Sequence, residues 1–224
     1  MIAPLTSWSL GLDLGQRSDR SALATLSLDW SVQGRNPVDW SWIRVPRLVL
    51  RDIERFPLGA PYLSFSEALA QRYRHIAALT PALTQPQIHL TVDAGGPGAP
   101  VIEHLRRARL RMDLKAILLT GGREPGATAA GTLTVPRRVL LSNLILLLDH
   151  GRLHAPHDLP GWPLLYEELL ALNAATWHPD KSTAHDDMVI ALAIAAWRIT
   201  RLHPELLPEP ANAPARWAPT GYLF

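Results

Sequence analysis

The chain has 224 residues, which is enough for one domain of ordinary size with a sizeable core. Its 22 Lys and Arg residues against 20 Asp and Glu residues give a net charge of +2, so the protein is not a polycation, and the lack of Cys excludes disulfides and thiolate metal sites. Only Lys115 and Lys181 are lysines. Arginine suits phosphate contact, but a GC-rich genome produces the same bias, and composition alone specifies no partner.

Neither a signal peptide nor a membrane span is expected. The opening stretch MIAPLTSWSLGLDLG has no basic segment and places Asp13 where a signal core would be apolar. The longest apolar runs, 139–148 and 188–197, are ten residues each, whereas a membrane helix needs ~20. We therefore expect no membrane contact and a cytoplasmic location.

The first part of the chain predicts three strands separated by polar turns. The first two are expected to form a hairpin, and Pro46 places the third at a sheet edge or a bulge. Trp8, Trp40 and Trp42 lie in these segments, and we expect them to fill the core rather than to stack on bases. The predicted strands are 8–14, 21–30 and 39–50.

The rest of the chain alternates helices and strands. Ser64 and Glu67 form a possible capping box at the start of the first helix, and Pro136 suits the first turn of another. The predicted helices are 64–79, 99–110, 137–149, 160–174 and a last one opened by Asp186 and Asp187; the strands are 87–93 and 114–119, and 121–131 is a loop.

This order predicts an α/β fold with a mixed five-stranded sheet, in which three antiparallel strands are followed by parallel crossovers, flanked by helices. Residues 1–202 are expected to form one domain. The proline-rich residues 203–224 are expected to be a tail without regular structure.

Four acidic residues lie at the ends of buried elements. Asp13 interrupts the first strand, Asp93 ends the fourth, and Asp186 and Asp187 open the last helix. Each alone has an ordinary explanation: Asp93 as a turn residue, Asp13 as the partner of an arginine such as Arg17, and the pair as acids favoured by the helix dipole.

Together the acids suggest metal binding. If the first and fourth strands are parallel neighbours, Asp13 and Asp93 project at the same carboxyl edge of the sheet, and the last helix can close a third side. Several carboxylates in one place repel one another unless a cation or a proton intervenes. Mg²⁺ or Mn²⁺ prefers oxygen ligands, and two such ions ~4 Å apart assist phosphodiester displacement.

An ordered set of stretches resembles the RNase H-like nucleases, and more narrowly the nuclease domain of bacteriophage large terminase subunits. The set covers residues 10–200, although each piece alone is modest. The matching stretches are GLDLGQRSDRSALA (11–24), TVDAGGPGAPVIEHLRR (91–107), ILLTGG (117–122), VPRRVLLSNLILLLDHGRL (135–153), LLYEELLAL (164–172) and HDDMVIALAIAAW (185–197).

The resemblance implies a metal-dependent endonuclease that cuts double-stranded DNA during viral genome packaging, in the host cytoplasm if the chain is phage-encoded. Asp13 and Asp93 would bind Mg²⁺ or Mn²⁺, as two ions, and the third acid would be Asp186 or Asp187, a choice that stays open. The family's partners are a packaging ATPase domain, a portal and a small terminase subunit.

The resemblance also suggests accessory residues. His185 would be a metal ligand, a proton relay or a helix cap. Asp19 would form an Asx turn or would contact the metal-binding side chains without binding the metal itself. Arginines around the acids would contact DNA phosphates, unless they are ordinary solvated surface residues; the candidates are Arg137, Arg138, Arg123 and Arg17.

One departure from the family is the lack of a GxxxxGK[ST] phosphate loop, so we expect no ATPase activity. The chain would then be a nuclease domain of a longer protein or a separately encoded nuclease. Three alternatives remain: a Holliday-junction resolvase with the same acids, an ATP-binding protein of the actin and sugar-kinase fold, for which the chain is short, and a non-catalytic docking module.

Overall fold

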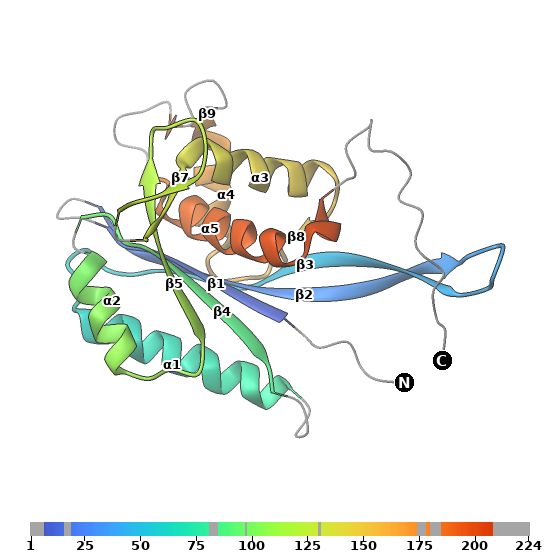
Figure 1. Cartoon of the computed structure of the whole chain (residues 1–224), viewed down its shortest axis with the longest axis horizontal. Coiled ribbons are helices and arrows are strands. Elements are labelled where there is room, and N and C mark those ends of the chain that lie inside the picture. Colours follow the sequence, from blue (N-terminus) through green and yellow to red (C-terminus); the bar gives the residue numbers. More distant parts are fainter. Residues whose placement is uncertain are drawn as a thin grey trace.

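The structure is a computed structural model and describes residues 7–15, 19–80, 85–96, 98–129, 131–173, 178–179 and 185–207. Within these ranges, eight strands form one mixed sheet in the order β6-β7-β5-β4-β1-β2-β3-β8, and helices cover both of its faces (Figure 1). A separate two-stranded sheet pairs β9 (Leu172–Asn173) with β10 (His178–Pro179). None of the helices described is long and apolar enough to cross a membrane.

The predicted antiparallel meander is confirmed. β1 (Ser7–Asp13) pairs with β2 (Ala22–Arg35), which pairs with β3 (Trp42–Arg55). Among the described residues, the only strand that pairs with the outer side of β3 is the short β8 (Leu153–His154), at Leu48 and Val49, so Pro46 lies at the sheet edge as expected.

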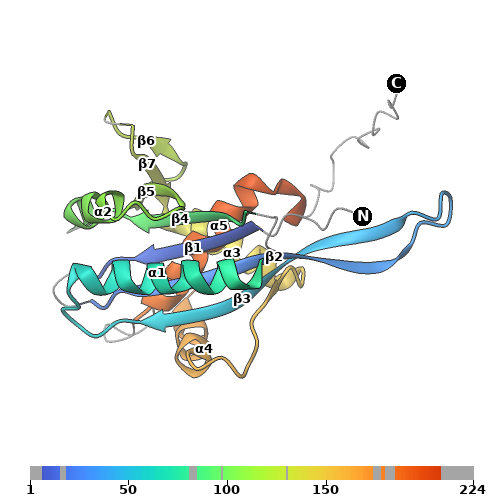
Figure 2. The same ribbon diagram turned by 90° about the horizontal axis from the view of Figure 1, so that it is seen from below.

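The distal half of the β2–β3 hairpin projects from the body of the molecule as an arm (Figure 2). This arm corrects the prediction for two tryptophans, because Trp40 is 68% exposed and Trp42 is 52% exposed, whereas Trp8 is buried as expected. The alternation of apolar residues continues along the arm, but none of the described helices covers it there (Figure 2).

The second half of the sheet is parallel. β4 (Gln87–Asp93) lies beside β1, β5 (Asp113–Thr120) beside β4, and β7 (Leu133–Pro136) beside β5. The two-residue β6 (Gly126–Ala127) adds to β7 in the segment predicted as a loop. The sheet thus has three short strands more than the five predicted, because strands of two to four residues are too short to show a period of two.

The helices form two layers. α1 (Tyr62–Leu79) and α2 (Gly98–Arg107) cover one face, and α3 (Arg137–Asp149) and α5 (Asp187–Leu202) cover the other, with α4 (Trp162–Ala171) beside α5 (Figure 1). The expected bounds of α3 are confirmed. The expected capping box of α1 is not formed, because the helix begins two residues earlier and the Ser64 hydroxyl donates to the Pro61 carbonyl.

The hydrophobic residues of the sheet divide between the two layers. Leu10, Leu12, Leu90 and Val92 pack under α1 and α2. The other cluster includes residues of β2, β3, α3 and α5, and also Leu206 of the short helix η1 (Pro204–Leu206), beyond the predicted boundary at residue 202. The two-part division of the chain stays a prediction, since residues 208–224 lie outside the described ranges.

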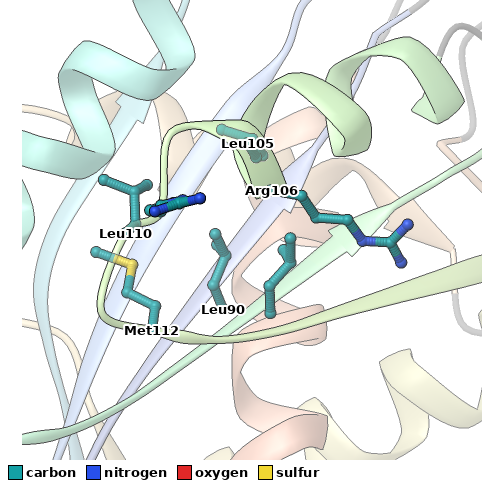
Figure 3. A pocket seen from close by; sticks show the side chains of 7 residues that line it. Leu90, Leu105, Arg106, Leu110 and Met112 are labelled. Atoms are coloured by element: carbon teal, nitrogen blue, oxygen red, sulfur yellow. The ribbon is translucent and has the colours of Figure 1, made fainter.

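A cavity of about 200 Å³ lies between α2 and the edge of β4 and β5. Figure 3 shows Leu90, Leu105, Leu110 and Met112 gathered around it, while the Arg106 side chain extends to one side. The cavity belongs to the layer of α1 and α2 and not to the layer of α5, so it is separate from Asp186 and Asp187 at the start of α5.

Helix α5 is the central element of its layer, and every residue from Asp187 to Thr200 is buried. Gly11 of β1 makes this possible, because a Cβ at that position would overlap the Ala191 carbonyl oxygen and lie 2.7 Å from the Ala195 nitrogen. The Ser9 hydroxyl also donates to the Ala195 carbonyl at 2.7 Å. These contacts require that α5 runs antiparallel to β1 at close range.

Candidate active site

Asp13 and Asp93 end two parallel neighbours. In the β1–β4 register Leu12 faces Val92, so the next residue of each strand, Asp13 and Asp93, reaches the same carboxyl edge. This confirms the arrangement on which the metal hypothesis depended, and that edge is the usual ligand edge of an α/β sheet. Asp93 is 9% exposed, and its Oδ1 accepts a hydrogen bond from the Gly95 amide at 3.0 Å.

The start of α5 lies over this edge. Ser9 faces Ala195, and Gly11 faces Ala191 and Ala195. Two residues along a strand span ~6.6 Å, which is close to the ~6 Å that four residues span along a helix. Moving from Gly11 to Asp13 along β1 therefore corresponds to moving from Ala191 to Asp187 in the first turn of the antiparallel α5. The close approach at Gly11 therefore places Asp187 near Asp13, although 174 positions separate them in the chain (187 − 13).

The two acids at the start of α5 have different surroundings. Asp186 is the N-cap residue, but its side chain makes no capping hydrogen bond and instead forms an ion pair with Arg137 of α3. Asp187 is 6% exposed, and its Oδ2 has no hydrogen-bond partner in the part of the chain that the structure describes. A buried carboxylate oxygen without a partner is costly and suits a cation.

The amides of the first turn of α5 are capped by a residue from another helix. Glu168 of α4 accepts hydrogen bonds on Oε2 from the backbone nitrogens of Met188 at 2.9 Å and Val189 at 3.0 Å. Its other oxygen forms an ion pair with Arg55 at the end of β3. Glu168 is therefore the residue that accepts the hydrogen bonds of these first-turn amides. Capping of α5 does not account for the presence of Asp186 and Asp187 at its start.

Glu168 and Arg55 were not among the predicted site residues. Glu168 lies in the apolar stripe of its helix, three residues after the buried Leu165. An acid in that stripe is a signal in the sequence from which its burial could have been predicted. Arg55 lay outside the predicted third strand, which ended at residue 50, whereas β3 continues to Arg55. Nothing in the sequence indicates that these two residues, 113 positions apart (168 − 55), are paired.

Burial raises the pKa of three of the acids. The pKa of Asp13 lies well above its ordinary value, first because the carboxyl is desolvated and then because Asp93, Asp187 and Asp186 repel its charge, with Arg137 opposing. Burial also raises the pKa of Asp93, against hydrogen bonds from the backbone. The site therefore holds more negative charge than its surroundings compensate, and it has an affinity for protons or cations.

Asp187 has the same shift with different neighbours. Burial is the main cause that raises its pKa, Arg55 is the largest opposing influence, and His185 also lowers it. Asp19 acts in the opposite direction and raises it. Both accessory candidates, His185 and Asp19, are exposed and near enough to Asp187 to influence it, while their roles stay predictions.

The arginine candidates do not form one group. Arg137 is tied to Asp186, so it belongs to the acidic site itself. Arg138 is exposed and donates to the Arg123 carbonyl at 2.6 Å, which brings Arg138 and the exposed Arg123 together beside the start of α3. Arg17 lies outside the described residues.

The donor set fits a hard divalent cation in its chemistry. Asp13, Asp93 and Asp187 offer only carboxylate oxygens, which Mg²⁺ and Mn²⁺ prefer, and Asp187 Oδ2 lacks a hydrogen-bond partner among the described residues. However, no three His, Asp or Glu side chains of the described ranges converge closely enough to hold an ion as they stand. The residues thus fit the ion by chemical type, and their side chains would have to draw together to hold it.

Comparison with known proteins gives the fold a name. No protein-family profile matches the chain, and no curated protein matches its sequence. Among solved structures, the nuclease domain of human cytomegalovirus terminase superposes with a TM-score of 0.58 at 12% identity, over 91% of this chain and 87% of that one. The nuclease domain of the large terminase subunit gp2 of bacterial virus Sf6 gives 0.51 at 14% identity, over 88% and 89%.

The chain has the RNase H-like fold of the terminase nuclease domains. The predicted fold class is therefore confirmed, and the actin and sugar-kinase alternative has no support among these matches. The terminase structures named here were determined with manganese: the cytomegalovirus domain was soaked with Mn and bound to an inhibitor, and the Sf6 domain carries manganese and beta-thujaplicinol. At these identities the likeness concerns the fold.

Proposed function

We propose that the protein is a divalent-metal-dependent endonuclease that hydrolyses double-stranded DNA during viral genome packaging. The observation that carries the proposal is the unpartnered, buried Asp187 oxygen at the sheet edge where Asp13 and Asp93 end. The manganese in solved terminase nuclease domains of the same fold supports the choice of ion.

Asp13, Asp93 and Asp187 would hold the metal. We favour Asp187 over Asp186 as the direct ligand, because Asp186 forms an ion pair with Arg137, while Asp187 Oδ2 has no hydrogen-bond partner among the described residues. When bound, Mg²⁺ or Mn²⁺, proposed as two ions, supplies an activated water and stabilises charge on the leaving oxygen.

The chain's own residues would place the DNA relative to this site. Arg138 and Arg123 lie together on the surface beside the start of α3, and Arg137 of the same turn reaches Asp186. The backbone amide of Gly95 holds the Asp93 carboxylate in place. Phosphate contacts by arginine position a duplex without reading its sequence, so binding should be salt-sensitive and of low sequence specificity.

The test is cleavage of supercoiled plasmid with Mn²⁺, with Mg²⁺ or with EDTA, comparing the wild type with Asp93→Asn. Metal-dependent cutting by the wild type that the variant lacks, with circular dichroism of the variant unchanged, is the expected result. Faster cutting of a four-way junction than of linear duplex would indicate a resolvase instead. A lack of cutting of either substrate with every metal would refute the proposed activity and leave a docking module.

A further inference from the structure

Glu168 is a buried acid outside the predicted ligand set. It is 5% exposed, and both of its carboxylate oxygens are engaged, one by two backbone amides of α5 and the other by Arg55. Arg55 is itself only 12% exposed at its side chain. A buried charge pair of this kind contributes little net stability compared with apolar residues, which leaves its purpose to be explained.

The geometry of this pair acts on the residue next to Asp187. The amides of Met188 and Val189 belong to the first turn of α5, where no intrahelical carbonyl is available to them. Both donate to the same Glu168 oxygen. The position of α4 therefore sets the direction of the first turn of α5, and with it the direction in which Asp187 points.

The charge of the pair matters as well. Arg55 lies beside the start of α5, because it pairs with the same Glu168 carboxylate that accepts a hydrogen bond from the amide of Met188, the residue next to Asp187. A lone guanidinium there would compete with a divalent cation for Asp187. Because Glu168 neutralises Arg55, the pair can hold the helix start without adding positive charge to the site.

We propose that Glu168 and Arg55 are positioning residues for the metal site: Glu168 fixes the first turn of α5 and at the same time neutralises Arg55, so that Asp187 stays oriented and available to a divalent cation. The part of this inference that concerns the cation rests on the proposed function. The part that concerns the helix start does not, and the two parts can be measured separately.

The first measurement is amide hydrogen exchange of Met188 and Val189 in EDTA. Since these amides have no other partner in the helix, Glu168→Ala should lower their protection at least about tenfold. Glu168→Gln retains an acceptor oxygen and should keep protection within about threefold of the wild type. Glu167→Gln is the matched control, because the adjacent Glu167 is exposed and is not one of the acceptors of these two amides. Unchanged exchange in Glu168→Ala would overturn the positioning role.

The second measurement is the affinity for Mn²⁺ itself, by isothermal titration calorimetry without DNA. Glu168→Gln leaves Arg55 uncompensated and should weaken Mn²⁺ binding about tenfold, the effect of ~1.4 kcal/mol of unfavourable charge. The double variant Arg55→Met with Glu168→Gln removes both charges and should return the affinity to within about threefold of the wild type, a rescue that a purely structural role does not predict.

The outcomes separate the two proposals. Wild-type Mn²⁺ affinity in Glu168→Gln, or no rescue in a folded double variant, would overturn the charge-balancing role. A wild-type protein that binds no Mn²⁺ would refute the proposed function and with it the cation part, while the exchange experiment would still decide whether Glu168 fixes the start of α5. Should Glu168→Ala fail to fold, the Met188 and Val189 amides are tested with Glu168→Leu, which removes the acceptor and keeps apolar volume.

Discussion

Asp13→Asn should stabilise the metal-free protein at neutral pH. The pKa of Asp13 in the folded protein lies well above its ordinary value, because the carboxyl is desolvated and surrounded by Asp93, Asp187 and Asp186. In the unfolded chain the pKa returns to ~3.9. Below that pH the carboxyl is protonated in both states, and its folded environment has no electrostatic cost.

The cost appears as the pH rises through the interval between the two pKa values. Folding stability then falls by about 1.4 kcal/mol for each pH unit of that interval, because the folded state binds the proton more tightly than the unfolded state does. Asparagine keeps the shape of the side chain and lacks this cost. For a domain of this size, 1 kcal/mol corresponds to about 2–4 °C in Tm, so we expect a rise of several degrees at pH 7.5 and little change near pH 4.

The assay is thermal unfolding in EDTA at half-unit steps from pH 4 to pH 8. Asp39→Asn is the control, and its effect on Tm at pH 7.5 should be opposite to that of Asp13→Asn. The reason is that hydrogen bonds from Ser41 lower the pKa of the exposed Asp39. Adding Mn²⁺ should make the Tm of the wild type higher than that of Asp13→Asn at pH 7.5. Binding to the native state stabilises the wild type, whereas Asp13→Asn lacks a metal ligand. An Asp13→Asn protein that is less stable than the wild type by the same amount at every pH would refute the reasoning.

Three further predictions concern the same region. Asp187→Asn should abolish measurable Mn²⁺ binding in calorimetry, whereas Asp186→Asn should weaken it by less than about tenfold; equal losses would contradict the assignment of Asp187 as the direct ligand. Gly11→Ala should lower the free energy of unfolding, measured by urea titration, by ~3 kcal/mol or prevent folding, because the methyl group would overlap the backbone of α5. Gly121→Ala is the control: a Cβ at that position meets nothing within 4 Å, so the free energy of unfolding should change by less than ~1 kcal/mol. Arg138→Ala should weaken DNA binding in fluorescence anisotropy and reduce the slope of log K against log salt by ~1, and an unchanged slope would show that Arg138 contacts no phosphate.

Local patterns were sufficient for several of the longer elements. The bounds of α3 and the hairpin of β1 with β2 followed from apolar periodicity and turn residues. The acid positions were visible for the same reason, since Asp13 and Asp93 each interrupt or end an apolar strand. The short strands β6, β7 and β8 were not visible, because they are too short to show a period of two. The exposure of Trp40 and Trp42 was not visible either, because apolar periodicity reports what a segment is able to bury and not whether another layer covers it.

The sequence by itself therefore determined the longer elements and their order, and that acids end two of the strands and begin the last helix. Only the tertiary structure decided which acids meet and what else meets them. The close contact at Gly11 brings the start of α5 to the ends of β1 and β4, and α4 brings Glu168 to the amides of that helix and to Arg55. Glu168 and Arg55, for example, are more than 100 positions apart in the chain. The residues adjacent to each of them in the sequence do not indicate a partner at that distance.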